Sequence, residues 1–69
     1  MELKFKLSRE YIELFKLLKA TRLVSTGGHG KIIIGAGEVM LNGDIEYRKR
    51  AKIRRGDTVE YEDKRIKIV

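Results

Sequence analysis

The residues with the clearest chemical potential form one dense basic run, Arg48-Lys49-Arg50-Ala51-Lys52-Ile53-Arg54-Arg55. It places six cations in eight residues with no acid among them, and the mutual repulsion is costly unless a partner relieves it. The run lies between an Asn42-Gly43 turn signal and a Gly56-Asp57 turn signal, so we expect it in a folded region and not in a loose tail. Fixed cations on a small scaffold suit a polyphosphate partner, which makes nucleic acid the first hypothesis.

A second candidate is the stretch 25–37, which holds five of the chain's seven glycines. Gly28-His29-Gly30 begins a G-x-G, but Ile33 stands where a dinucleotide fingerprint needs glycine. Ile32 stands where a Walker loop needs serine or threonine, so neither nucleotide motif is complete. A glycine-rich helix start could instead bring backbone N–H groups close to a phosphate, with Lys31 adding a charge.

Catalytic and metal-binding chemistry find little support in the sequence. His29 is the only histidine, cysteine is absent, and no acid, base and nucleophile constellation is evident. We interpret His29 as a solvated loop residue, with a phosphate or base contact as the alternative. The carboxylates are assigned to turns and to cross-strand pairing with cations. We therefore expect no enzymatic activity, no metal and no cofactor or small-molecule substrate.

Length and composition indicate one small domain spanning residues 1–69. A net charge of +6 with 42% hydrophobic residues predicts a basic globular module and not a disordered arm. The longest apolar run, Ile32–Ile34, is too short for a membrane span, and the residues after Met1 lack the apolar region of a signal peptide. We expect a cytoplasmic location and no membrane association.

Periodicity predicts the elements that must position these side chains. Apolar residues alternate over 3–7, which predicts a half-buried strand, placed at a sheet edge where its lysines deter pairing. Over 11–20 the apolar spacing becomes i, i+3, i+4, which predicts a short amphipathic helix. Ser8 could cap this helix early, or it could begin at Ile12 or Glu13.

The glycine-rich stretch 25–37 is ambiguous. Propensity favours a loop followed by a short strand, because glycine costs a helix interior about 1 kcal/mol relative to alanine. Ser25 or Thr26 as an N-cap and Gly37 as a helix end favour a helix instead. Periodicity does not decide between the two.

The remainder is predicted to be β-structure. Residues 39–41 alternate before the Asn42-Gly43 hairpin signal, and Ile45 and Tyr47 can continue the returning strand. A turn at 55–57 precedes two strands, 58–61 and 66–69, paired as a hairpin through 62–64. Of the aromatics, Tyr47 is best placed to stack a base, whereas Phe5 and Tyr61 are assigned to the core. The pattern therefore favours a structured helix or junction held by its phosphates over a stacked single strand.

Five sequence blocks resemble, in order, the S-four RNA-binding domain, which is named after the fourth protein of the small ribosomal subunit. Its core is called the αL motif, and the likeness is strongest to the short, stand-alone YbcJ-like members. The blocks are Ile12–Lys19, Ser25–Lys31, Gly37–Gly43, Glu46–Ile53 and Gly56-Asp57.

The resemblance implies an α+β fold in which two short packed helices, the αL motif, lie against a small, mostly antiparallel β-sheet. It makes residues 28–37 the second helix, which Gly30 and Gly35 are expected to loosen; at Gly30 the family more often has alanine. RNA would bind along the helices and the adjoining loop. The family's basic positions match Lys19, Lys31, Arg48, Lys49, Arg50 and Lys52.

The sequence therefore predicts non-catalytic binding of structured RNA, with ribosomal or transfer RNA expected, through a basic face that grips phosphates. The predicted RNA-binding residues are Lys19, Arg22, Ser25, Thr26, Gly27, Gly28, Lys31, Arg48, Lys49, Arg50 and Lys52. Arg54 and Arg55 extend the run beyond the family's pattern and stay outside this set. The alternative is a protein-interaction adaptor in a ribosome-assembly or DNA-maintenance complex, followed by a duplex DNA binder.

Overall fold

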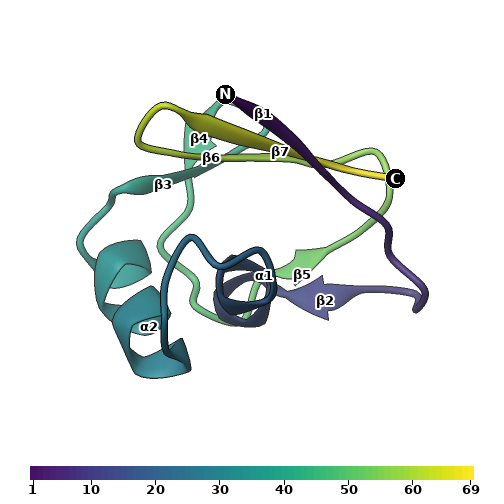
Figure 1. Ribbon diagram of the computed structural model, residues 1–69. Coiled ribbons are helices and arrows are strands. Elements are labelled where there is room, and N and C mark those ends of the chain that lie inside the picture. Colours follow the sequence, from purple (N-terminus) through teal and green to yellow (C-terminus); the bar gives the residue numbers. More distant parts are fainter.

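The computed structural model describes residues 1–69, which form two layers (Figure 1). The elements are β1 (Glu2–Phe5), β2 (Ile12–Glu13), α1 (Leu14–Ala20), α2 (Gly27–Gly35), β3 (Val39–Leu41), β4 (Asp44–Ile45), β5 (Lys52–Ile53), β6 (Thr58–Tyr61) and β7 (Lys64–Ile68). One layer is a five-stranded sheet in the order β1-β7-β6-β3-β4, and the other holds both helices and the two-stranded ribbon β2-β5. The predicted α+β class, with two short helices against a mostly antiparallel sheet, is confirmed.

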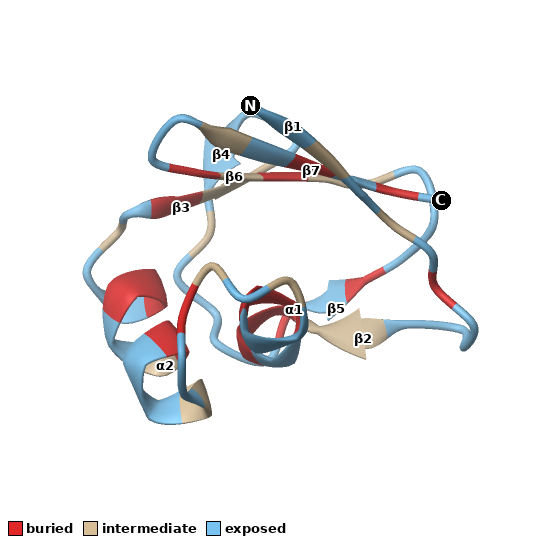
Figure 2. Cartoon of the chain, in the orientation of Figure 1, coloured by how far each residue is buried: buried red, intermediate tan, exposed pale blue.

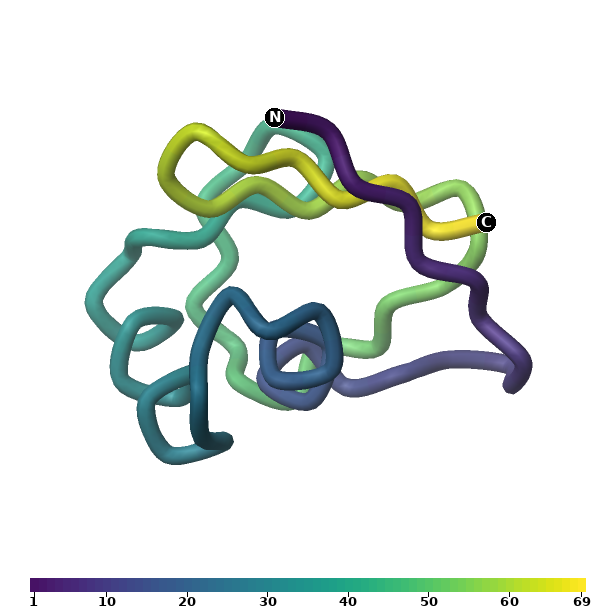
Figure 3. The backbone as a smooth tube through the Cα atoms, in the orientation of Figure 1, coloured from purple at the N-terminus to yellow at the C-terminus, as the bar shows by residue number.

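Strand β1 lies at the edge of the sheet, as the alternating pattern predicted. It pairs in parallel with β7, so that Leu3 stands opposite Ile66, while every other pair is antiparallel. This pairing brings the first and last segments of the chain side by side, as the purple and yellow ends of the tube show in Figure 3. The sheet is therefore completed only when both ends of the chain are in place.

The hydrophobic core fills the space between the two layers, where the buried segments of Figure 2 face one another. Helix α1 contributes Leu14, Leu17 and Leu18, all fully buried at the predicted helical spacing. Ile34 of α2 and Ile66 of β7 meet them in the same cluster. Full burial of each such side chain contributes about 1.5–3 kcal/mol, which is how a chain this short holds two layers together.

Helix α1 begins three residues later than the apolar pattern suggests. Ile12 and Glu13 are drawn into the ribbon, where Ile12 pairs with Ile53, and Glu13 becomes the N-cap residue. The expected start near Glu13 is therefore right and the Ser8 cap is wrong. The N–H groups of Leu14 and Phe15 donate to the carbonyl oxygens of Ala51 and Lys49, at 2.9 and 3.1 Å. The backbone of the basic run thus caps this helix.

The glycine-rich stretch forms helix α2, as the resemblance implied and against the propensity reading. Thr26 is its N-cap, and the Thr26 Oγ1 accepts a hydrogen bond from the His29 N–H at 3.1 Å. A Cβ on Gly30 would lie 3.3 Å from the Phe15 carbonyl oxygen. Gly30 therefore lies where the two helices pack closely, and this packing outweighs its low helix propensity.

The two predicted hairpins form with small differences in length. Asn42 and Gly43 adopt left-handed φ angles of 51° and 90°, as a tight hairpin turn between β3 and β4 requires. The returning strand ends at Ile45, so the expected continuation to Tyr47 is wrong. In the second hairpin Tyr61 pairs with Lys64, which leaves a two-residue turn. None of the helices is long and apolar enough to span a bilayer.

Candidate nucleic-acid interface

The aromatic ring of Phe15 gathers cations from three separate segments of the chain. The Lys31 Nζ lies 4.7 Å from the ring centroid, the Arg50 guanidinium carbon 5.0 Å, and the Lys16 Nζ 5.8 Å. The ring itself is only 9% exposed, at the junction of α1 and α2. Its electron-rich face attracts cations, which lets three like charges approach one another at this point. We call Phe15, Lys16, Lys31 and Arg50 the Phe15 cluster.

Glu13 holds two members of this cluster in place. Its carboxylate accepts hydrogen bonds from Arg50 Nη1 at 3.3 Å and forms an ion pair with Lys16 Nζ at 3.2 Å. The hydrogen bond from Lys16, with that from Arg50 added, lowers the pKa of Glu13 below its usual value. The two contacts of Glu13 therefore keep both cations beside the ring.

Arg48 is fixed by a second carboxylate, Glu46. The Arg48 Nε and Nη2 donate to the two carboxylate oxygens at 3.0 and 3.1 Å, and its backbone N–H donates at 2.9 Å. These hydrogen bonds lower the pKa of Glu46 and raise the pKa of Arg48. The Arg48 side chain nevertheless remains 76% exposed, so it is oriented and still available to a ligand.

The two groups of cations are continuous through Arg50. Arg48, Arg50, Lys52 and Arg54 line one open hollow whose remaining wall is Ala51. We call it the basic hollow. Because Arg50 also lies over the Phe15 ring, the surface runs from Lys31 on α2 to Arg48 without a break. The sequence could not show that these distant stretches converge.

The other predicted cations lie outside both the Phe15 cluster and the basic hollow. Lys49 reaches the end of α2, where its Cε lies 3.5 Å from the position that a Cβ on Gly35 would occupy. Lys19 lies in the last turn of α1, and Arg22 follows it with a left-handed φ of 61°. Neither Lys19 nor Arg22 forms an ion pair or lies over an aromatic ring, so the structure does not draw them into the Phe15 cluster.

The predicted backbone donors lie at the start of α2. The N–H groups of Gly27 and Gly28 belong to its first turn, where no intrahelical acceptor exists. Ser25 is exposed beside them, and the Thr26 oxygen is already the acceptor that caps the helix. Lys31 follows Gly27 by four residues and therefore lies on the same side of the helix.

Sequence reasoning missed Phe15, Lys16 and the surroundings of Tyr11. The Tyr11 ring has the Lys52 Nζ 5.0 Å and the Arg54 guanidinium carbon 5.9 Å from its centroid. No local pattern indicates this arrangement, because Tyr11 and Ile12 are both apolar and fit the helical spacing of the residues that follow. Tyr47 is 61% exposed, as expected beside Arg48, but no cation lies over its ring.

Arg55 is structural, in contrast to its neighbours in the basic run. Its Nη1 donates to the carbonyl oxygens of Leu7 and Arg9, at 2.6 and 3.0 Å. These bonds hold the segment between β1 and β2 against the turn that precedes β6.

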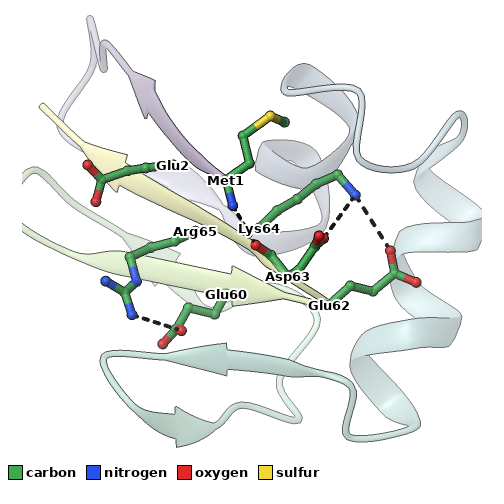
Figure 4. Close-up of a pocket in the computed structure, with 7 residues that line it drawn as sticks. All are labelled: Met1, Glu2, Glu60, Glu62, Asp63, Lys64 and Arg65. Atoms are coloured by element: carbon green, nitrogen blue, oxygen red, sulfur yellow. Dashed lines mark hydrogen bonds and ion pairs between the residues drawn. The ribbon is translucent and has the colours of Figure 1, made fainter.

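A hollow of opposite character lies at the turn between β6 and β7 (Figure 4). Here the Met1 amino group donates to the Asp63 carbonyl oxygen at 2.8 Å, and Lys64 pairs with the carboxylates of Glu62 and Asp63. Four carboxylates line it beside the Met1 amino group, Lys64 and Arg65, so it lacks the unopposed positive charge of the basic hollow. No group of acidic, histidine or cysteine side chains is arranged to hold a metal ion.

Comparison with known proteins identifies relatives of this chain. The S4 domain family matches residues 5–69. The YbcJ proteins of Escherichia coli and Shigella flexneri are each 37% identical over 59 residues, which cover 86% of this chain and 84% of theirs. The solution structure of E. coli YbcJ, which has an αL motif involved in RNA binding, superposes with a TM-score of 0.74. That match is 36% identical and covers 96% of this chain and 85% of YbcJ. The resemblance inferred from the sequence is confirmed: this chain belongs to the S4 domain family.

Proposed function

We propose that this protein binds structured RNA, without catalysing a reaction, by gripping phosphates with the surface that joins the Phe15 cluster to the basic hollow. One observation carries the proposal: Lys31 and Arg50, from distant segments, lie over a single aromatic ring, and Arg50 also lines the basic hollow. The αL motif of the relative YbcJ is involved in RNA binding, which supports RNA as the polyanion.

The contacts that order these cations favour tight binding. Arg50 is held by Glu13 and by the Phe15 ring, and Arg48 by Glu46. Because these side chains are already oriented, less rotamer entropy is lost when a phosphate binds. Phosphate contacts carry little base information, so we expect selection by RNA shape, with ribosomal or transfer RNA as targets.

The test is the salt dependence of binding to a structured RNA hairpin. If about six phosphate contacts form, log K should fall with log salt with a slope of roughly −4 to −6. Lys31→Ala should weaken binding to all structured RNAs alike and reduce the magnitude of that slope by about one.

Lys67→Ala is the matched control. Lys67 is exposed on β7 between the buried Ile66 and Ile68, so it faces away from the helices. The Lys67→Ala substitution removes the same charge from the opposite face, so the slope of log K against log salt should stay near the wild-type value. The proposal is wrong if both variants weaken binding equally, or if Lys31→Ala affects only RNAs with one particular base.

A further inference from the structure

Tyr11 lies on the solvent-facing side of the β2-β5 ribbon. Ile12 pairs with Ile53, which is fully buried, so this pair faces the core. Because side chains alternate along a strand, Tyr11 and Glu13 lie on the opposite face, together with Lys52 and Arg54. Tyr11 is 37% exposed and directly precedes β2, whose ribbon with β5 lies beside α1 (Figure 1).

Tyr11 also borders a second hollow, separate from the basic hollow that Lys52 and Arg54 line. Tyr11 lines an open hollow with Arg9, Glu10, Ile12, Glu13 and Lys16. Neither Lys52 nor Arg54, the two cations that approach the Tyr11 ring, lines this hollow. We call it the Tyr11 hollow.

The two hollows beside Tyr11 suit different parts of a nucleotide. The basic hollow is lined by four cations and no acid, which suits a phosphate. The Tyr11 hollow is lined by an aromatic residue, by the carboxylates of Glu10 and Glu13, and by the cations of Arg9 and Lys16, so its charges balance. Its carboxylates can accept hydrogen bonds from base amino groups. A flat, uncharged base therefore fits the second hollow when its backbone lies in the first.

We propose that Tyr11 stacks an unpaired base of the bound RNA, next to phosphates held by Lys52 and Arg54. The inference rests on the proposed function and narrows the ligand to an RNA helix with a bulged or terminal unpaired nucleotide. Tyr47 is a poorer platform, because its ring packs against Gly37, where a Cβ would lie 3.1 Å away, and no cation lies over it. Stacking on aromatic side chains tolerates any base, so the preference is for an unpaired nucleotide and not for a sequence.

The experiment compares three RNA hairpins of the same stem: fully paired, with one bulged nucleotide, and with an abasic bulge. The wild-type protein should bind the bulged hairpin about tenfold more tightly than the other two, the effect of one base–aromatic stack. Tyr11→Leu should lose this preference and bind all three equally, whereas Tyr11→Phe should retain it. Tyr47→Leu, at the other exposed tyrosine, should behave as wild type.

The outcomes separate this proposal from the one it rests on. Salt-dependent binding of all three hairpins with equal affinity would overturn the stacking site and leave phosphate binding intact. An equal loss with Tyr11→Leu on paired and bulged hairpins, or tight binding of the abasic bulge, would also overturn it. If no hairpin binds, both proposals fail. The affinity of Tyr11→Leu for the paired hairpin shows that the variant is folded.

Discussion

Lys31 and Arg50 are nineteen positions apart in the sequence, yet both lie over the ring of Phe15, at 4.7 and 5.0 Å from its centroid. Two cations this close repel each other, and the ring face and the Glu13 carboxylate offset that repulsion. The arrangement couples α2 to the basic run through Phe15, in the first turn of α1. A buried aromatic ring thereby sets the geometry of an exposed, charged surface.

Replacement of Phe15 should therefore reduce RNA affinity although Phe15 itself is mostly buried. Phe15→Leu keeps an apolar side chain and should cost about 1 kcal/mol of stability. Without the ring, Lys31 and Arg50 lose their common anchor, and affinity for a structured RNA hairpin should fall severalfold. The slope of log K against log salt should stay near the wild-type value, because every charge remains.

Ile66→Val is the control for Phe15→Leu. It removes one methylene from the fully buried Ile66 in the sheet layer and typically costs a similar 0.5–1.5 kcal/mol. Its RNA affinity should equal that of the wild type. An equal loss of affinity in both variants would show that reduced stability, and not the position of the cations, is responsible.

Substitution of Gly30 and of Gly35 in α2 should change the stability of the protein in opposite directions. At Gly30 a Cβ would already lie 3.3 Å from the Phe15 carbonyl oxygen, so Gly30→Val should push the helices apart and cost about 2 kcal/mol or more. At Gly35 the Cβ would meet only the flexible Lys49 side chain at 3.5 Å, and Gly35→Ala should stabilise the protein by up to about 1 kcal/mol. Urea denaturation measures the free energy of unfolding of both variants. Wild-type stability in Gly30→Val would contradict the close packing of the two helices.

Acid should weaken the fold in part through Glu46. Its pKa is lowered in the folded protein by the hydrogen bonds from Arg48. The stabilisation is therefore fully present above the unfolded-state pKa of about 4.5 and is lost as the pH falls through the lower folded-state value. Between pH 7 and acid pH, the urea midpoint of the wild type should drop further than that of Glu46→Gln. If the urea midpoints of the two proteins fall in parallel as the pH is lowered, Glu46 makes no such contribution to stability.

Arg54 and Arg55 should show reciprocal effects although they are adjacent. Arg55→Ala removes the donor to the Leu7 and Arg9 carbonyl oxygens and should lower the free energy of unfolding by about 1–2 kcal/mol, with little effect on RNA affinity. Arg54→Ala removes a cation from the basic hollow and should weaken RNA binding severalfold at nearly unchanged stability. Urea denaturation and RNA titration of both variants form the test, and an identical response would contradict the division of roles.

Much of the β-structure was predictable because it follows from local patterns. The alternation in β1, the Asn42-Gly43 turn and the pairing of β6 with β7 were all read from the sequence and are present. Strand β2 at residues 12–13 could not be predicted in this way, because it pairs with residues 52–53, about forty positions away in the sequence. For α2 the capping residues favoured a helix and the glycine content favoured a loop and strand, so only the family resemblance decided between the two.

The sequence by itself determined the charge of this protein, its basic run, its turns and the apolar spacing of α1, because these are properties of residue type and short-range order. Only the tertiary structure decided which cations meet, and that Phe15 and not Tyr47 lies at their centre. It also decided that Tyr11 lines one hollow while Lys52 and Arg54, which approach its ring, line another. Such relationships arise from contacts between segments that are distant along the chain. Their geometry depends on how the two layers pack and on where a glycine lets the helices approach, and neither is encoded within any one stretch of residues.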